Sequence, residues 1–390
     1  MIAVIADDLT GAAELGGIAL SYGLRVEITT EITGISLPAD IDLLIVAADT
    51  RSKPLVNALA DMKRITGQIT GLRPEFIFKK VDSVLRGYVA EEISVQLEIL
   101  GYNRALLVPA NPDLGRTIEE GIYYIQGRPI AESGFSGDPE FPATSSDVLE
   151  LLRSGQTVTV KKHTQSLPET GIVIGEAAVA SDLDHWAKVS REGTLLAGAS
   201  GFFKALLRGL GFSRNESLQS SDQSGSNKLF VCGSAFASSN ENVKRVFQSG
   251  GPVSYMPAAL MSDPDREDEL KSWAAEISTL MAEYGNAVIA IKPGLKGSAN
   301  AAQLRKTMSD VVKQVFKSVS INELIIEGGS TASSVLNQLS INVLRPVYEY
   351  STGVIRTKVS GFENLYVTLK PGSYNWPAQV WTLSEAEKQN

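Results

Sequence analysis

Two adjacent carboxylates, Asp7 and Asp8, stand near the start of the chain at the end of an apolar run. The run Ile2–Ala6 is typical of a strand buried on both faces, and an Ala-rich helical pattern opens at Thr10. A strand that turns directly into a helix leaves its loop at the carboxyl edge of a parallel sheet, where α/β proteins bind ligands. Helix capping by Asp8 or Thr10 would involve only one of the two acids. The pair therefore indicates contact with a cation, a metal or a ligand hydroxyl.

Further charged side chains follow other apolar runs in the first half of the chain. Arg51 comes after the run Leu43–Ala47, and Lys80 and Asp82 come after the run 76–78. Because the carboxyl ends of parallel strands meet at one sheet edge, we expect these side chains to converge. The candidates are the carboxylates Asp7, Asp8 and Asp82 and the cations Arg51, Lys80, Arg86 and Arg116.

This set of side chains suits phosphoryl transfer to a hydroxyl. The reaction needs a carboxylate near the acceptor hydroxyl and positive charge on the phosphates. Arg can also bind a substrate carboxylate through two parallel hydrogen bonds, whereas Lys acts as a point charge. Two alternatives stay open: any one cation could be a solvated surface charge, and Lys79, Lys80, Asp82 and Arg86 could form a structural salt-bridge cluster.

The first half of the chain alternates strand-like and helical patterns, which predicts βαβ units and a parallel sheet. Strands are expected at 2–6, 26–29, 43–47, 76–78, 105–108, 158–161 and 172–174. Helices are expected near 12–21, 54–66, 88–100, 147–153, 182–189 and 202–210. A small hairpin is expected at 122–130, with its turn at Gly127.

In the second half, glycine turns follow directly after three predicted strands. The strands expected at 228–232, 323–326 and 365–370 are followed by Gly233-Ser234, Gly328-Gly329 and Gly372-Ser373. A glycine turn that precedes a helix exposes backbone N–H groups at the positive end of the helix dipole, so these turns favour a nucleotide. The chain has no Walker A sequence, and no G-x-G-x-x-G follows its first strand, which argues against a P-loop and against NAD.

The length of 390 residues favours two domains rather than one. The Ser-rich polar stretch 213–227 lacks apolar periodicity and is typical of a linker. We therefore expect an α/β protein with two domains, at 1–212 and 228–390, each a mainly parallel sheet flanked by helices.

The composition and charge of the chain argue against several classes of binding partner. The net charge of −8 argues against nucleic acid. Cys232 is the only cysteine, and His163 and His185 lie far apart without ligand spacing, so we expect no metal site built from protein side chains. No apolar run approaches membrane-spanning length, and the N-terminus lacks the pattern of a signal peptide. The cytoplasm is therefore the expected location.

Several motifs together resemble one known family. They are ADDLTGA at 6–12, KKVDSVLRG at 79–87, and shorter matches at 109–117, 127–132, 138–139, 231–234, 328–331 and 370–373. Spread over nearly the whole chain, they resemble the four-carbon acid sugar kinases, a family first catalogued as a domain of unknown function. The resemblance implies an N-terminal domain that holds a sugar acid, a C-terminal domain that holds ATP, and an active site in the cleft between them.

The resemblance also implies roles for single residues. The nucleotide contacts would be Ser234, Gly329, Ser330, Thr331, Ala332 and Gly372. We expect Asp8 or Asp82 to orient the acceptor hydroxyl, although the base could be any of Asp7, Asp8 and Asp82. The expected substrate-binding residues are Asp7, Arg51, Lys80, Arg86 and Arg116, and we expect Arg51 or Arg86 to hold the substrate carboxylate. The chain departs from the family pattern at Glu14, Val84, Tyr88, Ser330 and 235–237, which leaves the substrate pocket and the binding of Mg²⁺ or the ribose open.

We therefore expect a kinase that uses ATP and Mg²⁺ to phosphorylate a hydroxyl of a four-carbon sugar acid of the threonate, erythronate or 3-oxo-tetronate type. Its partners would be the sugar acid and ATP, with no nucleic acid and no membrane; a homodimer is an open option. The alternatives are a non-catalytic sensor of a sugar acid or nucleotide, and a different α/β enzyme such as a ligase or dehydrogenase. The presence of both the carboxylate loops and the glycine turns favours the kinase, since a sensor needs only one set.

Overall fold

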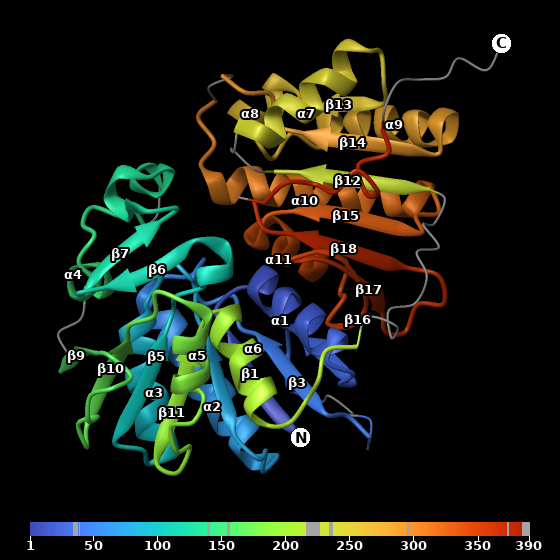
Figure 1. Cartoon of the computed structure of the whole chain (residues 1–390). Helices are drawn as coiled ribbons and strands as arrows, with labels where there is room; N and C mark the ends of the chain where they lie inside the picture. The colour runs from blue at the N-terminus through green and yellow to red at the C-terminus, as the bar shows by residue number, and fades with distance from the viewer. Residues whose placement is uncertain are drawn as a thin grey trace. The chain divides into compact units, whose positions relative to one another are not determined.

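The computed structural model describes residues 1–33, 38, 40–138, 141–153, 157–215, 227–233, 237–294, 297–372 and 374–383. The chain forms two compact units, Met1–Leu218 (unit 1) and Gln219–Asn390 (unit 2), both of the expected α/β type (Figure 1). The expected domain limits 1–212 and 228–390, with the linker 213–227, stay a prediction, because 216–226 lie outside the described residues.

Unit 1 is built on a parallel sheet. Its strand order is β2-β3-β1-β4-β11-β5-β10-β9, and all of these neighbours run parallel. The strands are β1 (Ile2–Ala6), β2 (Val26–Thr29), β3 (Leu43–Ala47), β4 (Ile77–Lys80), β5 (Arg104–Val108), β9 (Val158–Lys161), β10 (Gly171–Gly175) and β11 (Thr194–Gly198). Their carboxyl ends therefore share one edge, as the sequence predicts.

Helices cover this sheet because the strands are apolar on both faces. β1 is buried along its whole length, and Ala3 and Ile5 belong to one core cluster with Met62 and Ile65 of α2. Within unit 1, α2 packs with α3, and α1 packs with α6. The helices are α1 (Leu9–Ser21), α2 (Leu55–Gly71), α3 (Val89–Leu100), α4 (Val148–Leu152), α5 (Ala180–Trp186) and α6 (Ser200–Gly209).

A small antiparallel sheet lies between β5 and β9 in the chain. The predicted hairpin is confirmed as β7 (Ile122–Ile125) and β8 (Arg128–Pro129), and a further strand, β6 (Arg116–Glu119), pairs with β7. The sequence reasoning missed β6, because its four residues carry little apolar alternation. Short 3-10 turns flank this sheet at Pro112–Leu114, Ile130–Glu132 and Gly134–Gly137.

Unit 2 has a mainly parallel sheet with an antiparallel side. Its order is β13-β14-β12-β15-β18-β17-β16, and only the pairs β18–β17 and β17–β16 among these are antiparallel. The strands are β12 (Lys228–Cys232), β13 (Val253–Tyr255), β14 (Asn286–Ala290), β15 (Glu323–Glu327), β16 (Val343–Ser351), β17 (Val354–Val359) and β18 (Tyr366–Lys370). The helices are α7 (Ala237–Gln248), α8 (Ala258–Ser262), α9 (Glu267–Tyr284), α10 (Ala301–Ser318) and α11 (Gly329–Gln338). Among the described residues, no helix combines the length and the apolar character needed to cross a membrane.

One strand ends later than the sequence predicts, and the added residues include Lys80, which was expected in the site. The strand expected at 76–78 continues through Lys79 and Lys80, whose side chains therefore point to opposite faces of β4. Lys79 is fully buried and forms an ion pair of 2.5 Å with Glu92 of α3. Because Glu92 balances the charge of this ammonium inside the protein, a strand can contain two adjacent lysines that the sequence pattern placed in a loop.

Candidate active site

Asp8 is the N-cap of helix α1. Its Oδ1 accepts a hydrogen bond of 2.8 Å from the Gly11 backbone N–H, and its Oδ2 accepts one of 2.7 Å from the Thr10 hydroxyl. The same Oδ2 is ion-paired with the Arg51 guanidinium. Burial opposes ionisation, but Arg51 and Lys80 outweigh it and hold the pKa of Asp8 below its usual range. Both oxygens of Asp8 therefore already have partners within the protein.

Arg51 links three carboxylates from two loops, the loop after β1 and the loop after β4. Besides Asp8, its guanidinium lies 3.4 Å from Asp7 Oδ2 and 3.2 Å from Asp82 Oδ1. The Arg51 side chain is only 15% exposed. The structure thus brings together four residues that follow β1, β3 and β4, as the shared sheet edge predicts.

Asp82 is bound on two sides by arginines. Arg86 forms the bidentate pair, from Nε to Asp82 Oδ2 at 2.9 Å and from Nη2 to Asp82 Oδ1 at 2.9 Å. The third Arg86 nitrogen, Nη1, donates to Asp138 at 3.0 Å. Although burial favours the neutral acid, the charges of Arg86 and Arg51 hold the pKa of Asp82 far below its usual range. Of the salt-bridge cluster that the sequence left open as an alternative, Asp82 and Arg86 form a pair, whereas Lys79 pairs with Glu92 instead.

Asp7 differs from its two neighbours. It is 4% exposed, its Oδ2 faces Arg51, and its Oδ1 accepts no hydrogen bond from the described residues. Burial and the charge of Asp8 raise the pKa of Asp7 to about 6, against the opposing charges of Arg51, Lys79 and Lys80. A buried carboxylate with an unpaired oxygen and a pKa near neutrality has the properties of a general base.

Lys80 and Arg116 complete the predicted cationic set. Lys80 is buried and its ammonium donates to the Val81 carbonyl at 2.8 Å; a Cβ on Gly11 would lie 2.7 Å from Asp8 Oδ1 and 3.0 Å from this ammonium, so a larger residue would displace these side chains. Arg116 donates to the Ser83 hydroxyl and lies over the Phe135 ring at 5.9 Å. Neither Lys80 nor Arg116 forms an ion pair with a carboxylate in the described part of unit 1.

Phe135 is a residue of this site that sequence reasoning missed. Arg86 lies 5.6 Å from the centre of the same ring, so Phe135 contacts both arginines through cation–π interactions. A lone aromatic residue in a Gly- and Ser-rich stretch gives no periodic signal. Only the structure shows that Phe135 contacts Arg86 and Arg116, two of the predicted cations.

In unit 2 the glycine turns gather at one edge. The strands β12, β15 and β18 are direct neighbours and parallel, so Gly233, Gly328 and Gly372 follow adjacent strand ends. Gly328 caps helix α11 with a φ of 89°, and a Cβ on Gly233 would lie 2.6 Å from the Thr331 hydroxyl. Gly329, Ser330, Thr331 and Ala332 form the first turn of α11. Ser234, also predicted to contact the nucleotide, lies outside the described residues.

Buried polar residues lie at the strand ends directly before these turns. Cys232, Glu327 and Lys370 stand side by side at the ends of β12, β15 and β18. The Lys370 ammonium donates to the carbonyls of Pro371 at 3.0 Å and Tyr374 at 2.6 Å. It also lies 3.5 Å from Glu327. The two hydrogen bonds from Lys370 hold the loop that carries Gly372 in place.

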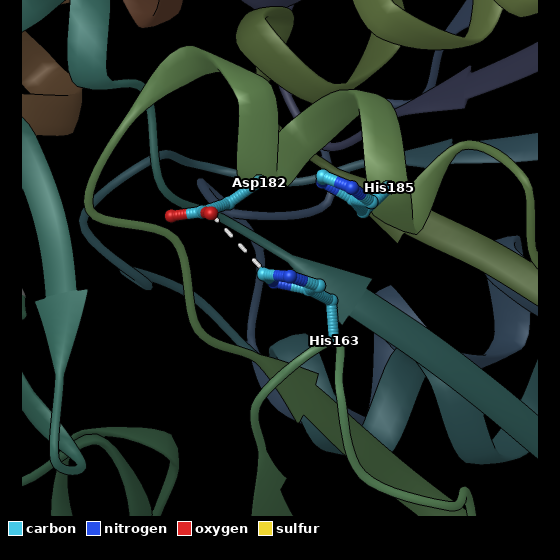
Figure 2. Close-up of side chains that lie close together, drawn as sticks. All are labelled: His163, Asp182 and His185. Atoms are coloured by element: carbon cyan, nitrogen blue, oxygen red, sulfur yellow. Dashed lines mark ion pairs between the residues drawn. The ribbon is translucent and has the colours of Figure 1, made fainter.

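The structure brings together two histidines that are distant in sequence, and the expected absence of a metal site stays a prediction. His163 and His185 are not separated: their rings stack with centroids 4.4 Å apart, next to Asp182 (Figure 2). His163 follows β9, and His185 lies on α5, which follows β10. Because β9 and β10 pair in parallel, residues 22 positions apart meet at the same sheet edge. Ligand-spacing rules detect only ligands that lie within one local motif.

Comparisons with known proteins agree with both units. A family model described as a sugar-binding N-terminal domain matches residues 2–206, and one described as a nucleotide-binding C-terminal domain matches residues 229–374. A 3-oxo-tetronate kinase of Pseudomonas fluorescens is 24% identical, over 96% of this chain and 94% of its own length. A D-threonate kinase of Bordetella bronchiseptica is also 24% identical, with the same coverage of both chains. This chain belongs to the four-carbon acid sugar kinase family.

As a four-carbon acid sugar kinase, the protein is a phosphotransferase that acts on an alcohol group. A second D-threonate kinase, from Salmonella typhimurium, is 23% identical over 86% of each chain. Among solved structures, a Salmonella typhimurium LT2 protein matches with a TM-score of 0.79 at 18% identity, over 99% of both chains. A Haemophilus influenzae protein matches with a TM-score of 0.69 at 19% identity, over 96% of this chain and 97% of its own. These structures share the fold.

Proposed function

We propose that this sugar-acid kinase transfers the γ-phosphate of ATP to a hydroxyl of a four-carbon sugar acid of the threonate, erythronate or 3-oxo-tetronate type. One observation carries the proposal: the buried Asp7 carboxylate, whose Oδ1 accepts no hydrogen bond from the described residues and whose pKa is about 6, lies beside the cations Arg51 and Lys80. The names of the related kinases support the substrate class.

In this proposal Asp7, rather than Asp8 or Asp82, accepts the proton of the acceptor hydroxyl. The hydroxyl donates to Asp7 Oδ1, which has no other donor among the described residues, while Arg51 holds Oδ2 in place. The oxygens of Asp8 and Asp82 are occupied by the helix N-terminus and by arginines. Catalytic roles for Asp8 and Asp82 stay predictions.

The substrate carboxylate would meet Lys80 and Arg116, the two predicted cations that pair with no carboxylate among the residues the structure describes. Arg116 is held by Ser83 and Phe135, and Lys80 is buried next to Gly11. An ordered guanidinium can bind a carboxylate through two hydrogen bonds with little loss of side-chain freedom. Arg51 and Arg86 would contribute positive charge at longer range, because their guanidinium groups are already ion-paired.

The nucleotide would bind unit 2 at the turns after β12, β15 and β18. Replacing Gly329 by Val should prevent close approach of the phosphates to the N–H groups of α11. We expect Gly329→Val to lower ATP affinity at least tenfold in isothermal titration calorimetry, with an unchanged circular dichroism spectrum. The control is Asn337→Val, which places the same β-branched side chain at an exposed position of α11. Equal affinity in both variants would place the nucleotide elsewhere.

Mg²⁺ would enter with ATP rather than through a cage of protein ligands. Mg²⁺ usually keeps several waters and binds through one or two carboxylates together with substrate phosphates. We therefore expect activity to disappear in excess EDTA and to return when Mg²⁺ is restored. Without nucleotide, Mg²⁺ should bind only weakly. Full activity in EDTA would contradict the expected Mg²⁺ dependence.

A panel of four-carbon acids with Mg²⁺ and ATP, read by ADP release, tests the proposed function directly. Each stereoisomer of threonate and erythronate, and the 3-oxo acid, should be compared with acids one carbon shorter and longer. The expected result is turnover confined to four-carbon acids. Binding of these acids without turnover would support a sensor instead, and turnover of unrelated alcohols only would reject the substrate class.

A further inference from the structure

A cluster of two histidines and one aspartate lies at the β9 end of unit 1 (Figure 2). Asp182 and His185 are three residues apart on α5 and share one face of the helix, and His163 comes from the loop after β9. One ligand atom from each of the three residues lies within 4.8 Å of the others, and the two imidazole rings are stacked at 14°, so one ring has to rotate before both can bind the same ion in their ring planes. We propose that His163, Asp182 and His185 bind a divalent transition-metal ion of the zinc type.

The tautomer of His185 suits a metal ligand. Its Nδ1 lies 2.8 Å from the carbonyl oxygen of Ser181. A carbonyl can only accept a hydrogen bond, so Nδ1 carries a proton, and in the neutral form of this ring the lone pair is on Nε2. A ring N–H held by a backbone carbonyl is the usual arrangement behind a metal-ligating histidine.

Asp182 is oriented in the same way. Its Oδ2 accepts hydrogen bonds from the backbone N–H groups of Ala178 at 2.9 Å and Val179 at 3.1 Å. Its Oδ1 is thereby directed at His163, with 3.6 Å between Oδ1 and Nδ1. That distance is too long for a hydrogen bond. It is close to the separation of about 3.4 Å between two ligands of a tetrahedral zinc ion with bonds of about 2.0–2.1 Å.

The cluster packs against a buried tryptophan on one side and is open to solvent on the other. The His163 ring meets the edge of Trp186 at 6.4 Å, and Trp186 is buried, with its N–H donated to the Glu176 carbonyl at 2.7 Å. His163 and Asp182 are 25% and 18% exposed, and His185 is exposed, so an ion has a path from solvent. Two imidazoles and one carboxylate leave one tetrahedral position for water.

This site is separate from the proposed phosphoryl-transfer residues. In the sheet order, β10 and β9 lie four and five strand positions from β1. At about 4.8 Å per strand this is about 20 Å from Asp7. A metal there would cross-link the loop after the edge strand β9 to α5, and it would have a structural role.

Nuclear magnetic resonance offers a direct test, because His163 and His185 are the only two histidines of the chain. The full chain, without a histidine tag, nucleotide or sugar acid, is titrated with ZnCl₂ while the imidazole C–H signals are followed. We expect both histidines to shift together and to saturate at one zinc per chain, and thermal unfolding to move to higher temperature. His185→Gln and Asp182→Asn should each weaken zinc binding at least tenfold.

Asp184→Asn is the matched control, since Asp184 lies on the same helix but pairs with Arg208. It should bind zinc like the wild type. Asn at 182 keeps an oxygen that can accept the two backbone N–H groups, so the helix start is preserved. No shift up to 1 mM zinc, a shift of only one histidine, or equal affinity in His163→Gln would overturn the proposal. Because no kinase ligand is present, the result is independent of the proposed function.

Discussion

Replacing Asp7 by Asn should lower kcat and kcat/KM together by about 10²–10⁴-fold, the usual contribution of a positioned general base. Asn keeps the size of the side chain but cannot accept the hydroxyl proton. KM for the sugar acid and for ATP should change little, because Arg51, Lys80 and Arg116 remain. Steady-state kinetics on the best four-carbon acid measure this. A rise in KM at constant kcat would show that Asp7 binds substrate without accepting the proton.

The pH dependence gives a second test of the same residue. Only the ionised carboxylate can accept a proton, and the pKa of Asp7 is raised to about 6 by burial and by Asp8. We therefore expect wild-type kcat/KM to fall about tenfold per pH unit below pH 6. Asp49→Asn is the control, because burial also raises the pKa of Asp49 to about 6. Loss of the acid limb in Asp49→Asn, with its retention in Asp7→Asn, would assign the limb to Asp49.

Asp7→Asn should also stabilise the protein at alkaline pH. The pKa of Asp7 is about 6 in the folded state against 3.8 for the free side chain, so the folded state favours the neutral acid. The stability that protonation provides is lost as pH rises through 6, at a cost on the order of 3 kcal/mol. The variant should therefore melt above the wild type at pH 8 and close to it at pH 4.5. Equal Tm differences at both pH values would argue against this burial cost.

Replacing Arg51 by Met should lower the free energy of unfolding by about 3–5 kcal/mol, the usual cost of removing one partner from a buried ion pair. Arg51 is the shared cation of Asp7, Asp8 and Asp82, which are all buried. Without it, their negative charges lie close together in a poorly solvated site. Urea denaturation at pH 7 measures the loss.

Arg25→Met is the matched control for Arg51. Arg25 also pairs with two aspartates, Asp40 and Asp42, but its side chain is 58% exposed. An exposed pair of this kind is screened by solvent and contributes little to stability, so the control should unfold near the wild-type urea concentration. The deficit of Arg51→Met should shrink at low pH, where the carboxylates are protonated. Similar midpoints for the two variants at pH 7 would contradict the proposed role of Arg51.

Local sequence patterns were enough to locate the candidate groups along the chain. The apolar run before Asp7 and the helical pattern after Thr10 are local features, so they predicted β1, α1 and the loop between them. The same reasoning found the strands before Gly233, Gly328 and Gly372. Parallel strands end at one edge, and this geometric rule was enough to predict that the charged loops of unit 1 converge.

Only the tertiary structure distinguished the three carboxylates of that edge. Asp7, Asp8 and Asp82 are identical side chains in similar loops, and their sequence contexts do not rank them. Burial, the pairing of Arg86 with Asp82, and the cap formed by Asp8 separate their pKa values. These effects depend on contacts between residues distant in sequence, such as Arg51 with Asp8, and no local pattern encodes them.

The contact between His163 and His185 also depends on which distant segments the fold brings together. Each histidine lies in an ordinary polar segment, and their sequence separation resembles no known ligand spacing. The rings lie 4.4 Å apart because β9 pairs with β10 at the edge of the sheet and α5 follows β10. Local periodicity predicts strands and helices, whereas the order of strands in a sheet is decided by packing over the whole domain.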